Sequence, residues 1–296
     1  MKKTILSLLL ILFVTSFAVS QQWFTSFKFA KRLAVLENKM IIAVWEESAL
    51  DNIPVLVEAD NKKLYQLTLF ENEQVDKLVW QYFIPVILSD QDYMQLAGKH
   101  LNGKSLKYKQ RFNDDQIKIM DPNGNIINTN QDPFSTANLT NLIRNYALNV
   151  GYLQPELTNY FENKSFSSTF RLTVKYQDMA TFAHQSVKKD ICELSGLYLA
   201  EAKQKLSKSD FDNTQALQQK LELLQLNEYL ILGKARKVYK ALKKINLEDV
   251  DAINTSLFAF LNYTSLTAIN KVDEALKWKD QVNQTDLNKV KHIVKN

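Results

Sequence analysis

Three carboxylates lie within six residues of one another, at Glu46, Glu47 and Asp51. A pair of carboxylates at this spacing suits general acid–base catalysis, in which one group donates a proton and the other accepts one. The same cluster suits an acidic patch that binds a basic partner. A solvated loop explains these residues as well, and the sequence favours that interpretation. We therefore keep them as candidate binding residues and assign no catalytic residue.

Other residues suited to nucleophilic or metal chemistry are few and scattered. The single cysteine, Cys192, cannot form a disulfide within the chain, although it can pair with another chain. Its apolar neighbours Ile191 and Leu194 indicate a buried, inert thiol. The three histidines are far apart in the sequence, and none has a second metal ligand three or four residues away. We expect no metal site and no cofactor.

Composition restricts the class of protein. The chain has 296 residues, 46% of them hydrophobic and 23% charged, which is typical of a globular protein of about two domains. The low numbers of glycines (6) and prolines (5) favour helix over a loop-rich β structure. The formal net charge of +5 is weak and dispersed, so nucleic acid is not an expected partner.

Residues 1–20 have the pattern of a secretory signal peptide. Lys2 and Lys3 precede an apolar run over residues 5–14, and Ala18-Val19-Ser20 supplies a small-x-small cleavage site. The apolar run is shorter than the ~20 residues that a membrane-spanning helix needs. We predict an exported protein, periplasmic or secreted, that is cleaved near Ser20 and has no membrane span in its mature chain.

A continuous apolar run, Met40–Trp45, predicts a strand that is buried on both faces. The residues before it include Trp23, Ser26, Ala30-Lys31-x-Leu33-Ala34 and Glu37-Asn38-Lys39-x-Ile41-Ile42. Together these motifs resemble the opening of exported bacterial proteins of the thioredoxin family. The resemblance implies a thioredoxin-like α/β fold over residues 23–150, in which helices flank a central mixed sheet.

In that family the strand leads into a Trp-Cys-Gly-Pro-Cys redox motif, and a cis-proline packs against the cysteines. The resemblance puts the redox motif at residues 49–53, so that Leu50 and Ile53 hold the two cysteine positions. It puts the cis-proline position at Asp115. Thiol–disulfide exchange needs a thiolate and a second, resolving thiol. Leucine and isoleucine supply neither, so the resemblance implies a scaffold without its redox site.

Further strands are predicted in this half of the chain. Phe83–Leu88 is a second buried run, and Ile117–Met120 and Ile126-Ile127 flank Asp121-Pro122-Asn123-Gly124-Asn125. Asn-Gly tolerates the positive φ of a tight turn, so this segment predicts a hairpin. A calcium loop is disfavoured, because the glycine is not at the sixth loop position and no bidentate glutamate follows.

Residues 151–166 have the composition of a linker with a short helix, and residues 167–290 predict an all-α domain. Alanines followed by apolar residues recur at Ala202, Ala235 and Ala275, at spacings of 33 and 40 residues. This pattern loosely resembles tetratricopeptide repeats, in which helix pairs stack into a solenoid. A generic helical bundle is the alternative. Trp278 suits either the core of this domain or a contact surface.

Two functions fit this organisation. The first is a non-enzymatic exported protein that binds another protein or an extended peptide, with Glu46, Glu47, Asp51 and Trp278 as candidate contact residues. The alternative is a chaperone-like accessory of periplasmic disulfide exchange, which either binds oxidised or misfolded chains or uses Cys192 in a mixed disulfide with a partner. Fold alone does not give function, so the sequence leaves the identity of the partner and the oligomeric state open.

Overall fold

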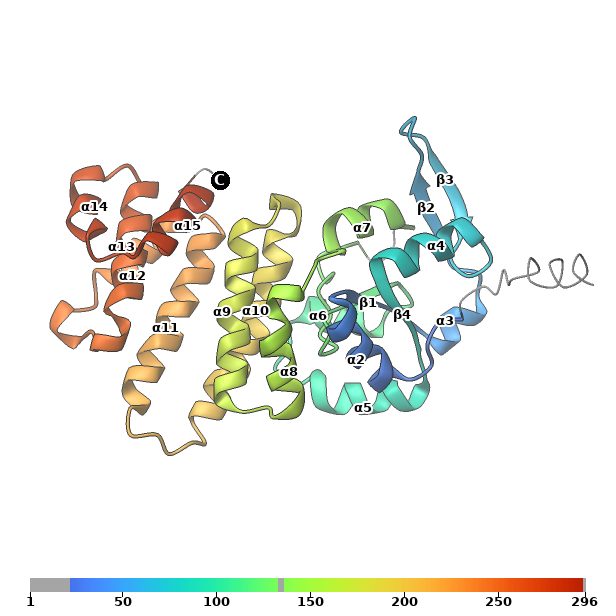
Figure 1. The fold of residues 1–296 in the computed structure, drawn as a ribbon, viewed down its shortest axis with the longest axis horizontal. Helices are drawn as coiled ribbons and strands as arrows, with labels where there is room; N and C mark the ends of the chain where they lie inside the picture. The colour runs from blue at the N-terminus through green and yellow to red at the C-terminus, as the bar shows by residue number, and fades with distance from the viewer. Residues whose placement is uncertain (1–21, 133–135, 295–296) are drawn as a thin grey trace, which may run out of the picture.

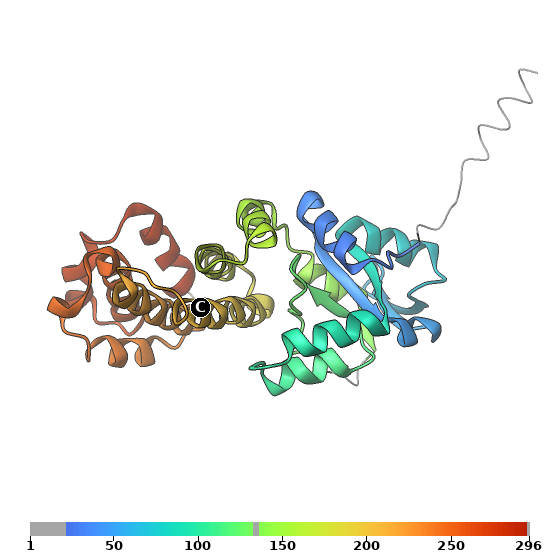
Figure 2. The ribbon, with the colours of Figure 1, turned by 90° about the horizontal axis from the view of Figure 1, so that it is seen from below.

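The computed structural model describes residues 22–132 and 136–294. Within these ranges the strands all lie in the N-terminal part, and the C-terminal part is helical. We call residues 22–150 the sheet half and residues 151–294 the helical half; they lie end to end in an elongated molecule (Figure 1, Figure 2). The predicted order, an α/β part followed by an all-α part, is confirmed. The predicted signal peptide lies outside the described residues.

The first sheet contains β1 (Met40–Trp45), β4 (Phe83–Leu88) and β5 (Lys118–Met120), in the order β4-β1-β5. β1 pairs with β4 in parallel and with β5 in antiparallel orientation, so β1 is the central strand. All six of its residues are buried, as the uninterrupted apolar run predicts. The strands at residues 40–45 and 83–88 are confirmed with the predicted bounds.

Single bridges extend this sheet at both edges. Phe24 pairs in parallel with Val86 of β4, and Ile126 pairs in antiparallel orientation with Met120 of β5. Across the sheet the segments therefore follow the order Phe24, β4, β1, β5, Ile126. In this order β5 alone runs against the direction of the other segments.

Helices cover both faces of the first sheet. The odd-numbered residues of β1 pack with α2 (Phe27–Glu37), α5 (Asp90–His100) and α6 (Leu106–Asn113). The even-numbered residues pack with α4 (Glu73–Tyr82) and α7 (Leu139–Tyr146). Successive side chains of a strand point to opposite faces, and this alternation divides the core into two layers.

The chain leaves β1 through α3 (Glu46–Leu50), a helix of 5 residues, and then forms a hairpin that the sequence analysis did not predict. β2 (Pro54–Glu58) pairs in antiparallel orientation with β3 (Leu64–Thr68) and in parallel with β6 (Ala137–Asn138). The order of this second sheet is β3-β2-β6. The β2–β3 hairpin projects from the body of the sheet half (Figure 1).

In the helical half, successive helices pack against one another. Residues 151–166, predicted as a linker with a short helix, contain a 3₁₀ helix and α8, and α8 contacts both α2 and α9. The helices are η1 (Gly151–Leu153), α8 (Gln154–Glu162), α9 (Phe166–Phe182), α10 (Gln185–Leu206), α11 (Thr214–Ile231), α12 (Ala235–Leu242), η2 (Leu247–Asp249), η3 (Ala252–Asn254), α13 (Thr255–Ala268), α14 (Val272–Lys279) and α15 (Gln284–Val294).

The helix pairs α11–α12 and α13–α14 repeat one another with a period of 37 residues. Gly233 and Asn270 occupy equivalent turns and have similar positive φ angles, 74° and 61°. The buried counterpart of Ala275 is therefore Val238. The predicted match of Ala275 with Ala235 is wrong by about one helical turn, because it relied on the shared alanine and not on the positions of the turns.

The predicted hairpin turn at residues 121–125 is confirmed. Gly124 has a φ of 91°, and its N–H donates to the carbonyl of Asp121 over 2.8 Å. The N–H of Asp121 donates in turn to the carbonyl of Asn125 over 2.9 Å. The structure adds that the whole turn is buried, because it faces α9 and α10 of the helical half.

The buried carboxylate of Asp121 is one of the groups that join the two halves. Its Oδ1 accepts the backbone N–H groups of Asn123 and Asn125 over 3.1 and 2.8 Å. Its Oδ2 accepts the hydroxyl of Tyr176 over 3.2 Å and the hydroxyl of Tyr198. Burial raises the pKa of Asp121 and of both tyrosines. One carboxylate oxygen of Asp121 is therefore satisfied within the turn, and the other by side chains of α9 and α10.

Candidate functional site

The exit from β1 holds three of the predicted binding residues. Glu46 and Glu47 form the first turn of α3 and are exposed, and Asp51 follows the helix and is also exposed. Ser48, on the inner side, is buried. The structure therefore brings the three carboxylates together on one exposed turn at the end of the central strand.

The two positions that the resemblance gave to cysteines differ in environment. Leu50 is 84% exposed at the end of α3. Ile53 is partly buried and packs against the main core cluster, and its carbonyl accepts the N–H of Leu69 over 3.0 Å. One side chain is therefore available to a partner, and the other belongs to the base of the hairpin.

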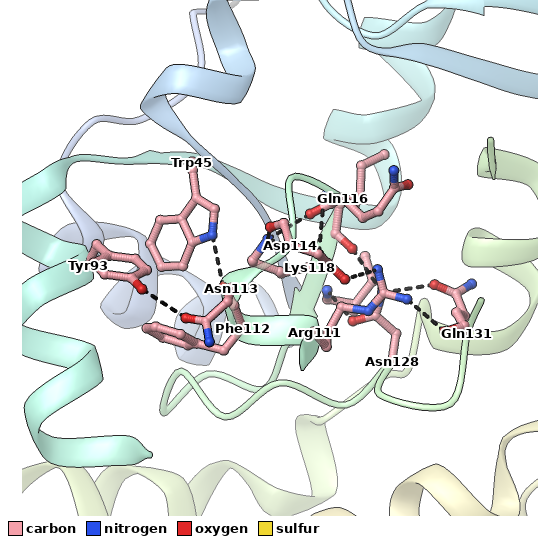
Figure 3. A network of polar contacts seen from close by, with 12 residues as sticks. Trp45, Tyr93, Arg111, Phe112, Asn113, Asp114, Gln116, Lys118, Asn128 and Gln131 are labelled. Atoms are coloured by element: carbon pink, nitrogen blue, oxygen red, sulfur yellow. Dashed lines mark hydrogen bonds and ion pairs between the residues drawn. The ribbon is translucent and has the colours of Figure 1, made fainter. Parts of the chain in front are cut away.

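Beneath this turn, Trp45 begins a buried polar network (Figure 3). The indole Nε1 donates to the carbonyl of Phe112 over 2.9 Å. The indole ring packs edge-on against Tyr93 and Phe112, with ring centroids 5.0 and 5.1 Å apart. The ammonium of Lys118 lies 5.1 Å from the centroid of the same ring. Trp45 thus belongs to the core, as predicted, and also connects α5, α6 and β5.

Lys118 is fully buried, although it is charged when protonated. Its ammonium donates to the carbonyls of Asp114 and Gln116, over 2.5 and 2.8 Å, and lies 3.4 Å from the Asp114 carboxylate. Burial lowers the pKa of Lys118 to about 8, and the negative charge of Asp114 opposes this shift. The three acceptors use the donors of the ammonium, so Lys118 fixes the backbone of residues 114–116.

Arg111 completes the network from α6. Its Nη1 lies 3.0 Å from Oδ2 of Asp114, and its Nη2 donates to the carbonyl of Gln131 over 2.9 Å. Asn128 makes a side-chain hydrogen bond to β5, in which its Oδ1 accepts the N–H of Ile119 over 2.9 Å. The carboxylate of Asp114 is therefore shared by two buried cations, and a polar cavity of about 230 Å³ adjoins it.

The position that the resemblance gave to the cis-proline, Asp115, lies in the loop fixed by Lys118. Its side chain is exposed. The described residues contain no cis peptide bond. The shape of this loop therefore depends on hydrogen bonds from a buried ammonium. The sequence analysis did not predict Lys118 or Arg111, because a charged residue inside a short strand or helix carries no signal of its burial.

The fourth predicted binding residue, Trp278, lies in a different region. It is half-buried on α14 and packs edge-on against Phe258, with ring centroids 5.5 Å apart. Figure 1 shows α14 and α3 at opposite ends of the molecule. Trp278 therefore does not share a site with Glu46, Glu47 and Asp51.

Cys192 lies on α10 and is buried. Burial raises the pKa of its thiol to about 12, so the thiol is protonated at neutral pH and a partner thiol would have to open the helical packing to reach it. In the part of the chain that the structure describes, no group of three or more histidine, cysteine, aspartate or glutamate side chains is arranged to hold a metal ion.

Comparisons with family models, curated proteins and solved structures give no match for this chain. Over residues 22–132 and 136–294, none of the helices combines the length and the apolar character needed to cross a membrane.

Proposed function

We propose that this chain is a non-enzymatic exported protein, with a thioredoxin-like domain in its sheet half, that binds another protein or an extended peptide. The order of the segments across the first sheet supports a thioredoxin-like domain, since β5 alone runs against the others and helices lie on both faces. That arrangement is the mixed sheet that the resemblance implies.

The observation that carries the binding role is the surface of α3. At and just before the place that the resemblance gives to the redox motif, the exposed side chains include the carboxylates of Glu46, Glu47 and Asp51 and a leucine, Leu50, that is 84% exposed. A protruding apolar residue bordered by carboxylates suits a contact with a partner that offers an apolar pocket beside basic groups. The fixed network around Lys118 supports this turn from below.

Disulfide exchange through Cys192 has less support as a second role, because the thiol is buried and protonated at neutral pH. A reductase assay with insulin as the substrate checks this point. We expect no turnover above the uncatalysed rate, and measurable turnover would contradict the non-enzymatic assignment.

Photo-crosslinking in the producing cells tests the binding role. A photo-reactive residue replaces Asp51, and the matched control replaces Lys240, which is exposed on α12. We expect a defined protein adduct from position 51 that weakens about ten-fold when Glu46, Glu47 and Leu50 are changed to alanine. Adducts from position 240 alone would move the binding role to the helical half and contradict the proposal for α3.

A further inference from the structure

The outer edge of β3 is an open strand edge. Among the residues that the structure describes, β3 has a neighbouring strand on one side only, in the order β3-β2-β6. The N–H of Ala59 donates to the carbonyl of Lys63, and the N–H of Leu69 donates to the carbonyl of Ile53. These two hydrogen bonds lie just beyond the two ends of the paired strands β2 and β3.

The residue pairing between these two hydrogen bonds shows in which direction the N–H and C=O groups of each β3 residue point. Tyr65 and Leu67 pair with Val57 and Val55. Hydrogen-bonded pairs alternate along an antiparallel ladder, so Tyr65 and Leu67 point their N–H and C=O groups towards β2. Leu64, Gln66 and Thr68 point theirs outward, in the positions that an additional strand requires.

The side chains of β3 do not protect this edge. Natural sheets block open edges with charged residues, prolines, bulges or covering segments. The sequence of β3, Leu-Tyr-Gln-Leu-Thr, contains no charge and no proline, and it pairs with β2 residue for residue. Leu64 is 51% exposed and Tyr65 is 49% exposed. An added strand would therefore gain main-chain hydrogen bonds and cover apolar surface on both faces.

Charge at one end of the edge indicates the orientation of an added strand. Lys62 and Lys63 are exposed immediately before β3. Of the two carboxylates nearby, that of Glu58 is paired with Arg144 over 3.5 Å. That of Asp60 is exposed in the same turn and forms no ion pair with a described residue, so the two lysines outnumber the one unpaired carboxylate. Antiparallel pairing is the more stable arrangement per residue, and it places the C-terminal end of the added strand beside the two lysines. A carboxylate at that end of the ligand complements their charge.

We propose that the β3 edge binds an extended segment of a partner protein by antiparallel strand addition, and that the charge of this segment is confined to a carboxylate at its C-terminal end, beside Lys62 and Lys63. The inference rests on the proposed binding function and names a second contact surface for it, distinct from α3. Strand addition of this kind draws its affinity from the main chain and its specificity from alternate side chains.

A second copy of the chain is a poorer occupant. Antiparallel pairing of two β3 strands centred on Gln66 places Lys62 and Lys63 opposite Phe70 and Leu69 of the other copy. The lysines then face apolar residues, of which Leu69 is fully buried in its own chain. The five-residue edge therefore suits a short extended peptide better than self-association.

The test uses the full mature chain and a synthetic peptide that alternates valine and threonine and ends in two glutamates. Fluorescence anisotropy measures its binding against two control peptides. One control carries the glutamates at the N-terminus, and the other has N-methyl groups on alternate amides. We expect each control to bind about ten-fold more weakly. Equal binding of the N-methylated peptide would overturn strand addition.

Variants of the edge locate the binding. Gln66→Pro removes an outward N–H without removing a bond to β2, and Leu64→Glu places a negative charge beside the acidic end of the peptide. We expect both to weaken binding at least about ten-fold, whereas Lys77→Glu on exposed α4 leaves it within about two-fold. Circular dichroism and the urea midpoint establish that each variant is folded, and the Leu64→Glu variant decides the result if Gln66→Pro alters the hairpin.

The remaining outcomes separate this inference from the proposed function. If position 51 still gives adducts but the peptide binds both edge variants as tightly as the natural chain, the binding function stands and the β3 assignment is overturned. A dimer in gel filtration that dissociates on Leu64→Glu would show that a second copy occupies the edge, and would also overturn it. Peptide binding that depends on the edge, in a chain that gives no adduct from position 51, would support the β3 inference and contradict the role of α3.

Discussion

The Asp121–Asn125 turn and the β2–β3 hairpin are both strand connections of the sheet half, but their polar groups lie in opposite environments. In the turn, hydroxyls of Tyr176 and Tyr198 from the helical half satisfy the carboxylate of Asp121. In the hairpin, no strand within residues 22–132 and 136–294 pairs with the outer edge of β3. The residues of a turn determine its local backbone conformation. The burial of the Asp121 turn depends instead on tyrosines that lie 55 and 77 residues further along the chain.

The turn therefore belongs to a surface that is buried within the protein, whereas the β3 edge belongs to a surface that a partner can reach. A single hydrophobic cluster runs from Met40 of β1 to Ile293 of α15, so the two halves share one core. The buried turn completes the polar part of that shared interface. The β3 edge lies outside the β2–β3 ladder, and the register points the main-chain groups of Leu64, Gln66 and Thr68 away from β2. The proposed binding is therefore assigned to this edge and to α3 and not to the surface between the halves.

Removal of the Asp121 carboxylate is the change with the largest expected effect. In the Asp121→Ala variant, two backbone N–H groups and two tyrosine hydroxyls lose a buried acceptor. We expect the free energy of unfolding to fall by about 3–5 kcal/mol, measured by urea denaturation. The matched control, Asp115→Ala at an exposed position, should change it by less than about 0.5 kcal/mol. A stable Asp121→Ala protein would contradict the account of the interface.

The pH dependence of stability should carry a contribution from Glu228 on α11. Burial raises its pKa from 4.5 to about 7, against hydrogen bonds from Ser195 and Gln225 that lower it. Between these pH values the folded protein holds a proton that the unfolded chain has released. The free energy of unfolding therefore falls as pH rises from 4.5 to beyond 7, with up to about 3 kcal/mol from this group.

The Glu228→Gln variant should remove that contribution, so its stability exceeds that of the natural chain most at pH 8 and least at pH 4. Glu222→Gln, at an exposed position on the same helix, is the matched control for the substitution. Parallel pH profiles for the natural chain and the Glu228→Gln variant would show that Glu228 titrates normally. Because Asp121 and Asp190 also have raised pKa values, only the difference between profiles is informative.

Loss of the Lys118 ammonium should have a moderate effect confined to one loop. Lys118→Met keeps a long apolar stem but leaves the carbonyls of Asp114 and Gln116 without their donor. We expect the free energy of unfolding to fall by about 1–3 kcal/mol and amide exchange in residues 114–116 to accelerate. Lys77→Met, at an exposed position, is the control. Unchanged exchange in the loop would contradict the fixing role of Lys118.

The two positions that the resemblance assigns to cysteines, Leu50 and Ile53, should give the smallest and the most sharply contrasted effects on stability. Ile53 packs against the core, so Ile53→Ala should cost about 1–2 kcal/mol. Leu50 is 84% exposed, so Leu50→Ala should change stability by less than about 0.5 kcal/mol while weakening crosslinking from position 51. Thermal denaturation of the two variants side by side measures the contrast, and equal destabilisation would contradict the exposure of Leu50.

Some of this structure could be predicted from the sequence for clear physical reasons. Met40–Trp45 and Phe83–Leu88 are uninterrupted apolar runs, and buried strands of a mixed sheet require such runs. The Asn-Gly pair gives the turn at residues 121–125 its positive φ. Glu46, Glu47 and Asp51 are close in sequence, so their common location follows from chain continuity.

The remaining features depend on distant partners. The strands of the hairpin, Pro54–Glu58 and Leu64–Thr68, mix exposed and half-buried residues, and this weakens their pattern. The burial of Lys118 depends on carbonyls of a neighbouring loop, and the burial of Asp121 depends on tyrosines of two later helices. Single residues of these types carry no sequence signal of such contacts, because exposed lysines and aspartates are far more common.

Amide hydrogen exchange of the full mature chain, followed by NMR, tests the central contrast most directly. We predict that the amides of Leu64, Gln66 and Thr68 exchange close to the unprotected rate, whereas those of Asn123 and Asn125 exchange only through global unfolding. Addition of the acidic-ended peptide should then slow the β3 amides alone. Protected amides at Leu64, Gln66 and Thr68 in the free protein, or rapid exchange at Asn123 and Asn125, would contradict the assignment of the β3 edge as open and of the turn as buried.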